Sequence, residues 1–290
     1  MARIDLHAHT TASDGTLSPS DLVAEAVRAG LSAVAITDHD TLDAIAPASA
    51  AARRAEPPLR VIPGVELSAE HDDLEFHLLG LLIDPIAPEL RRRLVAMRAE
   101  REDRAERIVE RLRDLGHVLD LSTVRNQAAH GASLGRPHVA RALMTIGLVS
   151  SVNEAFDKWL GEGCPAYIPK PRLAAPDAIE LIHEAGGVAI MAHPFTVPEA
   201  AREAMVRDLA RLGLDGLEVE YPRHSTADRA RYQAWADELG LVATGGSDFH
   251  GANKPDIALG HGVDGNVHVQ PSVLEALEAR LASRRARQPA

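Results

Sequence analysis

Two pairs of potential metal-binding side chains occur with a spacing of two residues. His7 and His9 close the first apolar run of the chain, and Asp248 and His250 repeat the spacing far along it. Side chains two positions apart on a strand point to the same face, so each pair presents both ligand atoms together. Neutral imidazole is the commonest metal ligand in proteins, and the two pairs therefore indicate a site for divalent cations.

Further histidines and carboxylates follow the other apolar runs. Taken singly, each has an ordinary structural explanation; Asp14, for example, precedes Gly15 as in many turns. The joint pattern indicates a metal site, in which Glu66 can bridge two cations because a carboxylate has two oxygens. Nine ligands suit two or three cations with positions left for water and substrate. The nine candidates are His7, His9, Asp14, His39, Glu66, His77, His193, Asp248 and His250.

The segments that must position these residues alternate between strands and helices. Strands are predicted over residues 3–7, 33–37, 61–68, 75–83, 188–192, 216–220 and 242–246. Helices are predicted over residues 19–29, 42–54, 176–185, 198–212, 225–239 and 272–284. Repeated strand–helix units predict an α/β fold with a parallel sheet and outer helices, and about seven strands in roughly 200 residues favour a closed barrel. In such barrels the reacting groups lie at the C-terminal ends of the strands, where the candidates fall.

The alternation stops between residues 88 and 172. Residues 88–115 have a helical, heavily charged pattern, and the rest of the segment is helical and rich in loops. A solvated helix with ion pairs between successive turns is the simpler explanation of its arginines. We predict that residues 1–87 and 173–290 form the metal-dependent barrel. Residues 88–172 are predicted to form a mostly helical insertion that covers the substrate on the C-terminal face.

Composition excludes several other classes of protein. The 290 residues include 31 basic and 42 acidic side chains, a formal net charge of −11, which argues against binding to duplex nucleic acid. A single cysteine, Cys164, excludes an internal disulfide and a cysteine-based zinc cluster. No apolar run approaches the roughly 20 residues of a membrane helix, and the first residues lack the apolar stretch of a signal peptide. We expect a cytoplasmic protein without membrane contact, and no protein partner is indicated.

The motifs around the nine candidates resemble those of the PHP (polymerase and histidinol phosphatase) family. They are His7-Ala8-His9, Ser13-Asp14-Gly15, Ala35-Ile36-Thr37-Asp38-His39, Pro63-Gly64-Val65-Glu66, Ala192-His193-Pro194 and Gly246-Ser247-Asp248-Phe249-His250. The resemblance implies a distorted seven-stranded barrel that binds three cations, with manganese favoured and zinc or iron as alternatives. It implies three ligand sets, namely His7, His9, Glu66 and Asp248; Glu66, His77 and His193; and Asp14, His39 and His250.

Clustered cations suit the hydrolysis of phosphoesters. They lower the pKa of a bridging water and offset charge on the phosphate oxygens, so that no cysteine or serine nucleophile is needed. We expect Glu66 to be shared by the cations that hold the attacking hydroxide. Asp14, His39 and His250 would hold the substrate phosphate or the leaving oxygen. These four residues are the predicted catalytic groups.

Within the family, the chain resembles the 3′,5′-nucleoside bisphosphate phosphatases most closely in residues 14–19, 135–138 and 167–170. That resemblance implies conversion of adenosine 3′,5′-bisphosphate to AMP and phosphate. Degradation of short 5′-phosphorylated RNA from its 5′ end is an alternative, and histidinol phosphatase is a weaker one. A bisphosphate needs a second anion pocket, although each basic side chain is equally well explained as a solvated surface charge. The candidates are Arg101, Arg104, Gly135, Arg136, His138 and Lys170.

Two other functional classes also fit part of the pattern. Amidohydrolases carry His-x-His on a barrel, but this chain has no lysine at a central predicted strand end to form a carbamylated bridge. A metal- or nucleotide-binding protein without turnover is the non-enzymatic alternative, and the complete ligand set disfavours it. Hydrolysis of a phosphomonoester by the metal-loaded protein separates the three.

Overall fold

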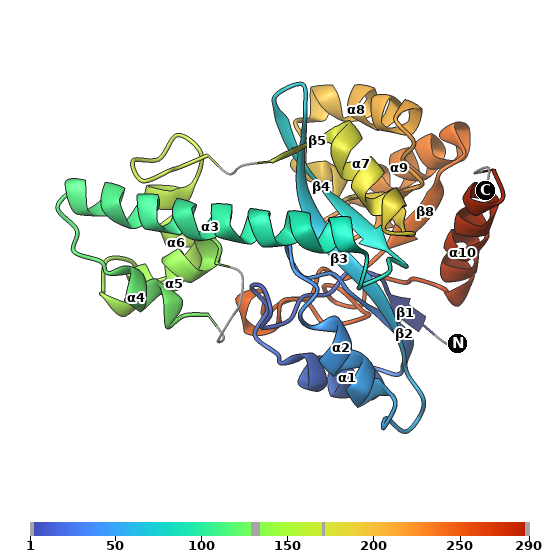
Figure 1. Cartoon of the computed structure of the whole chain (residues 1–290), viewed down its shortest axis with the longest axis horizontal. Helices are drawn as coiled ribbons and strands as arrows, with labels where there is room; N and C mark the ends of the chain where they lie inside the picture. The colour runs from blue at the N-terminus through green and yellow to red at the C-terminus, as the bar shows by residue number, and fades with distance from the viewer. Residues whose placement is uncertain (1–2, 129–133, 170–171, 288–290) are drawn as a thin grey trace.

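A mixed β-sheet forms the centre of the computed structural model, which describes residues 3–128, 134–169 and 172–287 (Figure 1). The strand order is β1-β2-β3-β4-β6-β7-β8, and β5 pairs with β3 outside this path. The strands are β1 (Arg3–Asp5), β2 (Leu31–Ile36), β3 (Arg60–His71), β4 (Leu74–Leu81), β5 (Leu173–Ala174), β6 (Val188–Ala192), β7 (Gly216–Glu220) and β8 (Val242–Gly245).

Helices cover the sheet and extend to one side of it. They are α1 (Pro19–Arg28), α2 (Ile45–Ala52), α3 (Pro88–Asp114), α4 (Leu121–Arg125), α5 (Arg136–Thr145), α6 (Val152–Ala155), α7 (Ala175–Glu184), α8 (Glu199–Arg211), α9 (Thr226–Leu239) and α10 (Pro271–Arg285). The start of α1 is as predicted, because the Ser18 side chain accepts a hydrogen bond from the Asp21 amide and Pro19 opens the helix. No helix in the described ranges is long and apolar enough to cross a membrane.

The prediction of an α/β fold is confirmed, but the prediction of a wholly parallel sheet is wrong at β4. This strand runs antiparallel to both β3 and β6, whereas the other paired strands are parallel. Asp72 and Asp73 form the turn between β3 and β4, with φ of 49° and 63°, which is the backbone of a tight hairpin. The chain has no room for a crossover helix there, so β4 reverses direction.

The reversal of β4 explains how a residue near the start of a strand joins the candidate site. His77 pairs with Ser68 of β3 and with Ala192, the last residue of β6. In an antiparallel strand the first half lies where its parallel neighbours end. His77 therefore reaches the C-terminal edge of the sheet, although it does not end a strand.

The two edges of the sheet approach each other beyond the ends of β1 and β8. Ala8 and Phe249 form an isolated parallel bridge. The His9 amide donates to the Phe249 carbonyl at 2.9 Å, and the Asp248 amide donates to the His7 carbonyl at 2.8 Å. The candidate ligand segments are thus joined by their own backbone hydrogen bonds.

One apolar cluster draws together strands that lie far apart in the sheet order. It contains Ile4 of β1, Ala33 of β2, Ile62 of β3, Leu79 of β4 and Ile190 of β6. Because β1 and β6 are separated by three strands in the path, the sheet must curl for their side chains to meet. Closure into a seven-stranded barrel stays a prediction, supported by this cluster.

Helix α3 connects two cores. Leu90 and Leu94 in its first half belong to a cluster with residues of β3, β4 and α7. Ile108 and Leu112 in its second half pack with Leu143 and other residues of α4 to α6. Figure 1 shows α3 extending from the sheet to these small helices. The separate core of α4 to α6 supports the predicted insertion over residues 88–172.

A buried carboxylate joins the opposite end of the sheet to the last helix. Asp215 precedes β7 and accepts hydrogen bonds from His183 Nε2 at 2.8 Å and from the Ala189 amide at 3.0 Å. It also accepts from Arg280 Nε at 3.1 Å and Arg284 Nη1 at 2.7 Å. Burial raises the pKa of Asp215, but these donors outweigh it, so that the pKa lies below its ordinary value.

We expect Asp215→Asn to lower the free energy of unfolding by about 2 kcal/mol at pH 7, because it removes the counter-charge of Arg280 and Arg284, whose side chains are 33% and 16% exposed. Because the pKa of Asp215 is lower in the folded protein than in the unfolded chain, its ionised carboxylate stabilises the fold at pH values above the ordinary pKa of an aspartate. This stabilisation is lost as the pH falls through the pKa of Asp215 in the folded protein. The difference from the wild type should therefore shrink below about pH 4. Urea unfolding, monitored by tryptophan fluorescence at each pH, measures the difference in the free energy of unfolding. Asp237→Asn, on the exposed side of α9, is the control; equal effects of the two substitutions would contradict this role.

Candidate metal centre

Glu66 lies at the centre of a ring of histidines. It is 1% exposed and sits in the middle of β3. Its Oε1 lies 2.7 Å from His77 Nδ1 and 3.0 Å from His193 Nε2. Its Oε2 lies 3.0 Å from His9 Nε2, 3.3 Å from His39 Nδ1 and 3.4 Å from His7 Nε2. Each carboxylate oxygen thus faces its own group of imidazoles, as a bridge between cations requires.

The remaining candidate ligands complete the ring from two loops. Asp14, in the loop after β1, places its Oδ1 3.3 Å from His250 Nε2 and its Oδ2 3.9 Å from His39 Nε2. Asp248 and His250 follow β8, and Asp248 Oδ1 lies 3.5 Å from both His7 Nε2 and His9 Nε2. The structure therefore brings all nine predicted ligands into one cluster.

The ligand atoms fall into four overlapping groups, in each of which they lie within 4.8 Å of one another. The groups are His9, Asp14, His39 and His250; His7, His9 and Asp248; His7, Glu66 and His193; and His39, Glu66 and His77. The first contains the whole predicted Asp14 set and adds His9. The predicted set of Glu66, His77 and His193 is divided between the last two groups, which share Glu66.

The protonation states of the cluster suit divalent cations. Burial raises the pKa of Glu66, but the surrounding imidazoles outweigh it and hold the pKa well below its usual value. Burial lowers the pKa of His9 and His39, which favours their neutral forms. His9 Nε2 and His39 Nδ1 are buried and have no hydrogen-bond partner among the described residues. The neighbouring carboxylates raise the pKa of His7 and of His250, so a bound cation would take the place of a proton on these two imidazoles. Ionised carboxylates and deprotonated imidazole nitrogens are the donor set that manganese, zinc or iron would take.

Glu218 of β7 orients two of the histidines. It is fully buried; its Oε1 lies 3.1 Å from His7 Nδ1, and its Oε2 accepts a hydrogen bond from the His193 amide at 2.7 Å. A carboxylate at Nδ1 favours the tautomer of His7 that leaves Nε2 free to face Glu66. Sequence analysis missed this residue, although an acidic side chain inside the apolar strand over 216–220 was a usable signal.

The second oxygen of Asp248 is held by two residues that sequence analysis also missed. Asp248 Oδ2 accepts a hydrogen bond from the Tyr221 hydroxyl at 2.8 Å and forms an ion pair with Lys254 Nζ. Burial, reinforced by the Asp248 carboxylate, raises the pKa of Tyr221, so that its hydroxyl remains a donor. These contacts leave Oδ1 directed at His7 and His9. The φ of Asp248 is 52°, a left-handed backbone that its partners must maintain.

Two more buried carboxylates fix the loops that carry the ligands. Asp38 accepts hydrogen bonds from the Thr10 amide at 2.8 Å and from the Ser13 hydroxyl at 2.6 Å, beside Asp14. Asp5 accepts from the Ser247 amide at 2.9 Å and its hydroxyl at 2.5 Å, beside Asp248. Both candidate ligands are therefore held by backbone contacts as well as by their own side chains.

Three predicted substrate-binding arginines gather where the second half of α3 faces α5. Arg101 is buried, and its Nε lies 2.5 Å from Asp40 Oδ2. Arg104 Nε donates to the Ile168 carbonyl at 2.8 Å, and its Nη2 is buried without a partner in the described part of the chain. Burial, with the neighbouring charges of Arg136 and Arg101, lowers the pKa of Arg104 to about 10. The local field therefore favours an anion.

Arg136 lies at the entrance to the metal cluster. Its guanidinium lies 5.4 Å from the centre of the Phe156 ring and 5.8 Å from that of Tyr167. It lines one pocket together with His77, His193, Arg172 and several other residues. Arg172 was not among the predicted substrate-binding residues. Lys170, which was, lies outside the described residues.

The predicted pair of Gly135 and His138 forms the start of α5. His138 Nδ1 accepts a hydrogen bond from the Gly135 amide at 3.0 Å. Burial and the charge of Arg141 lower the pKa of His138 to about 4, so that it is neutral near pH 7; a hydrogen bond links it to the Ser13 backbone. His138 thus contacts the Asp14 loop rather than an open pocket.

Comparisons with known proteins identify the family of this chain. A PHP domain model matches residues 5–143. The 5′-3′ exoribonuclease Rnm of Escherichia coli K12 is 38% identical over 248 residues, which cover 85% of this chain and 84% of that protein. A 3′,5′-nucleoside bisphosphate phosphatase of Chromobacterium violaceum is 33% identical over 283 residues, 97% of this chain and 98% of that protein. The chain belongs to the PHP family.

Membership of the PHP family extends to the three-dimensional fold. A solved structure from Bifidobacterium adolescentis, assigned as a metal-dependent phosphoesterase, superposes with a TM-score of 0.86 at 31% identity and covers 96% of both chains. The predicted family is therefore confirmed, and the protein is a metal-dependent phosphoesterase. The roles of its individual residues are taken up as proposals.

We expect Glu218→Gln to weaken manganese binding by about 10- to 100-fold, as is typical when the partner of a histidine ligand is altered. The amide still fills the space but no longer fixes the tautomer of His7 by charge. Manganese content after dialysis against a series of buffered metal concentrations measures the affinity. Glu220→Gln, two residues along β7 and paired with Arg229, is the matched control and should bind metal like the wild type. Unchanged affinity in Glu218→Gln would contradict the orienting role.

Proposed function

We propose that this PHP protein hydrolyses the 3′-phosphate of nucleoside 3′,5′-bisphosphates, with adenosine 3′,5′-bisphosphate converted to AMP and phosphate. The observation that carries the proposal is the pocket shared by His77, His193, Arg136 and Arg172. Candidate metal ligands and cationic side chains line the same pocket; Glu75 also lines it and pairs with Arg172 at 2.6 Å. Arg136 is then the cation that could hold one phosphate while another reacts beside it. The nearly full-length likeness to a bisphosphate phosphatase supports this choice.

The cation ligands of the proposal are the nine residues of the cluster. When bound, two or three divalent cations would neutralise charge on the reacting phosphate and make water nucleophilic near neutral pH. Glu66 would be shared between cations, because its two oxygens face different imidazoles. Glu218, Tyr221 and Lys254 would keep His7 and Asp248 in their binding orientations.

The reacting phosphate would lie over the partly exposed side of the cluster. His39 has 15% and Asp14 13% of its side chain exposed, whereas His7 and Glu66 are almost fully enclosed. His77 is 23% exposed and lines the pocket that contains Arg136, whereas His250 is only 7% exposed. A phosphate can therefore approach His39, Asp14 and His77 from solvent, and Glu66 is reached only behind them. In the reaction the oxygen of water bonds to phosphorus, the bond from phosphorus to the 3′-oxygen breaks, and the 3′-oxygen takes up a proton.

The second phosphate would bind to the arginines. The guanidinium of Arg136 is held by two aromatic rings and donates to the Leu160 carbonyl at 3.3 Å, so its plane is fixed before an anion arrives. A planar guanidinium with further N–H groups free suits a phosphate dianion. Arg104 lies near enough to Arg136 for the charge of Arg136 to lower its pKa. The two guanidinium groups together make the electrostatic potential positive where the second phosphate would bind.

A second candidate function uses the same bond cleavage. The first phosphodiester of a 5′-phosphorylated RNA is also attached to the 3′-oxygen of a 5′-phosphorylated nucleotide. Hydrolysis at that bond releases a 5′-mononucleotide, as hydrolysis of the bisphosphate does. The likeness to the Escherichia coli 5′-3′ exoribonuclease over 85% of the chain favours this candidate.

We expect Arg136→Ala to lower kcat/KM for adenosine 3′,5′-bisphosphate by about 10- to 100-fold, the value of one charged hydrogen bond to phosphate. For adenosine 3′-monophosphate, which lacks the second phosphate, the decrease should be less than about 3-fold. Phosphate release by the manganese-loaded protein measures both. Arg107→Ala, an exposed position on α3, should leave both substrates unaffected. An equal loss on both substrates in Arg136→Ala would show that Arg136 does not bind the second phosphate.

A further inference from the structure

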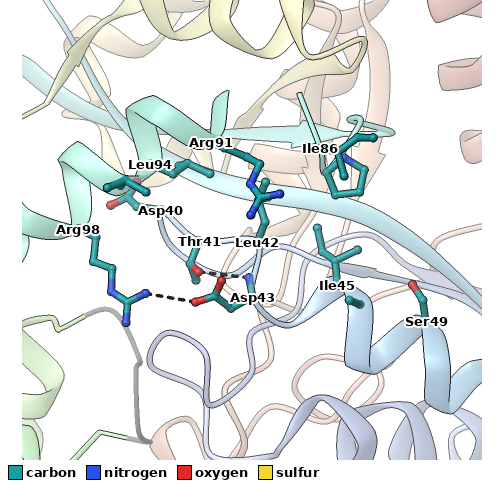
Figure 2. Close-up of a pocket in the computed structure, with 13 residues that line it drawn as sticks. Asp40, Thr41, Leu42, Asp43, Ile45, Ser49, Ile86, Arg91, Leu94 and Arg98 are labelled. Atoms are coloured by element: carbon teal, nitrogen blue, oxygen red, sulfur yellow. Dashed lines mark hydrogen bonds and ion pairs between the residues drawn. The ribbon is translucent and has the colours of Figure 1, made fainter. Parts of the chain in front are cut away.

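A second cavity, of about 440 Å³, lies between α2 and the first half of α3. We call it the α2–α3 groove and define it by Leu42 and Ile45 on one wall, Arg91, Val95 and Arg98 on the other, and Ile86 at one end (Figure 2). Its volume is within the range of about 300–1,000 Å³ found for ligand pockets. None of the nine candidate metal ligands lines it.

The walls of the groove present apolar surface to solvent. Ile86 is 69% and Val95 70% exposed, which are among the highest values for large apolar side chains in the described residues. Ile45 and Leu94 are buried and form the floor beneath them. Exposed apolar side chains of this kind can pack against a nucleobase, and leaving them in contact with water is unfavourable.

The groove carries positive charge in a protein whose net charge is negative. Asp43 is paired with Arg98 at 3.2 Å, and Asp40 with Arg101 at 2.5 Å, so both acidic residues of the lining are neutralised. No carboxylate of the described residues lies within 4.0 Å of Arg91. Figure 2 shows its guanidinium directed into the groove above Leu42. An anionic ligand therefore fits better than a cationic or neutral one.

Neighbouring residues of one backbone segment belong to the metal cluster and to the groove. Asp40, which lines the groove, directly follows the candidate ligand His39. Its amide donates to the Glu66 carbonyl at 3.1 Å, and His39 and Glu66 form a parallel bridge. The groove therefore begins one residue from the candidate ligand His39, and because Asp40 is only 1% exposed, a ligand shared by the two sites would pass over this backbone segment.

We propose that the α2–α3 groove binds the part of a 5′-phosphorylated oligoribonucleotide that follows the scissile phosphodiester. A base would rest on Ile86 and Val95, and the next phosphate would pair with Arg91, assisted by Arg98. The inference rests on the second candidate function. In a bisphosphate the reacting phosphate has three terminal oxygens, whereas in RNA one of these oxygens carries the next nucleoside. That nucleoside must leave the cluster over a surface, and the groove supplies one.

The reaction served by the groove is a balanced hydrolysis. One water adds to the phosphodiester between the first and second nucleotides, and the bond from phosphorus to the 3′-oxygen breaks. The 3′-oxygen takes up a proton and leaves as part of a 5′-mononucleotide. The phosphate stays on the shortened RNA, which keeps a 5′-phosphate and can be cleaved again.

The test compares a short and a long substrate. For Arg91→Ala we expect kcat/KM on 5′-phosphorylated penta-adenylate to fall by about 10-fold, the lower range for a charged hydrogen bond to phosphate. The rate on adenosine 3′,5′-bisphosphate should stay within about 2-fold of the wild type, because that substrate does not reach the groove. Ile86→Glu, at an exposed position, should act in the same direction by repelling the RNA. Arg92→Ala, adjacent on α3 but paired with Glu89 outside the groove, is the matched control.

Binding is measured as well as turnover, so that failure of the proposed function is distinguishable from failure of the groove. Fluorescence anisotropy of 5′-phosphorylated penta-adenylate with a 3′-fluorescein label gives Kd for the manganese-loaded protein and its variants. A Kd raised about 10-fold by Arg91→Ala and by Ile86→Glu, but not by Arg92→Ala, supports the groove even if the wild type releases no product. Unchanged Kd and rates in both groove variants would overturn the proposal. A protein segment would then be the alternative ligand of the groove. An equal loss on the bisphosphate and on the RNA would also overturn it.

Discussion

A carboxylate buried among five imidazoles is the interaction on which the rest of this protein depends. Removing Glu66 from water costs several kcal/mol, and the cost is offset only if ring nitrogens or cations surround both oxygens. Those histidines come from the ends of β1, β2 and β6 and from β4. The curvature of the sheet, the reversal of β4 and the bridge between Ala8 and Phe249 all serve to bring them within reach.

The second requirement is that the histidines keep one orientation without relying on the substrate. Buried carboxylates outside the cluster meet it: Glu218 holds His7, Asp38 holds the Asp14 loop, and Asp5 holds the segment before Asp248. A cluster whose shape is fixed before substrate binds loses little free energy in reorganisation, which is how electrostatic catalysis is made effective. The arginines of the helical segment lie beside the cluster rather than in it, and in the proposed function they would distinguish substrates.

The sequence made the clustering of the candidate ligands predictable for a physical reason. The two-residue period of strands makes pairs such as His7 and His9 visible, and the alternation of strands with helices places them at one edge. The predicted direction of β4 was wrong, because Asp72 and Asp73 form a hairpin turn where a crossover connection was expected. His77 therefore reaches the cluster on a strand that runs in the opposite direction. The chain contains the hairpin signal, but an expectation of parallel strands concealed it.

The supporting residues were harder to find because their types are common and their partners are distant. Glu218 is separated from His7 by 211 positions, and no local pattern links them. Lys254 was overlooked in a loop, although it pairs with Asp248 only six positions away. Among the predicted anion-binding residues, Arg136 lies at the pocket, whereas Arg101 is engaged with Asp40 and His138 with the Ser13 loop. The charge pattern of α3 could not separate these roles, because helix periodicity does not show which neighbours face it.

The central claim is that the Glu66 cluster directs water to phosphorus and breaks the bond to the 3′-oxygen. Hydrolysis of adenosine 3′,5′-bisphosphate in ¹⁸O-labelled water by the manganese-loaded protein tests it most directly, with mass spectrometry of both products. The account predicts one ¹⁸O atom in each inorganic phosphate released, none in AMP, and no release after the metal is removed with a chelator. Label in the 3′-hydroxyl of AMP, or release that continues without metal, would contradict it.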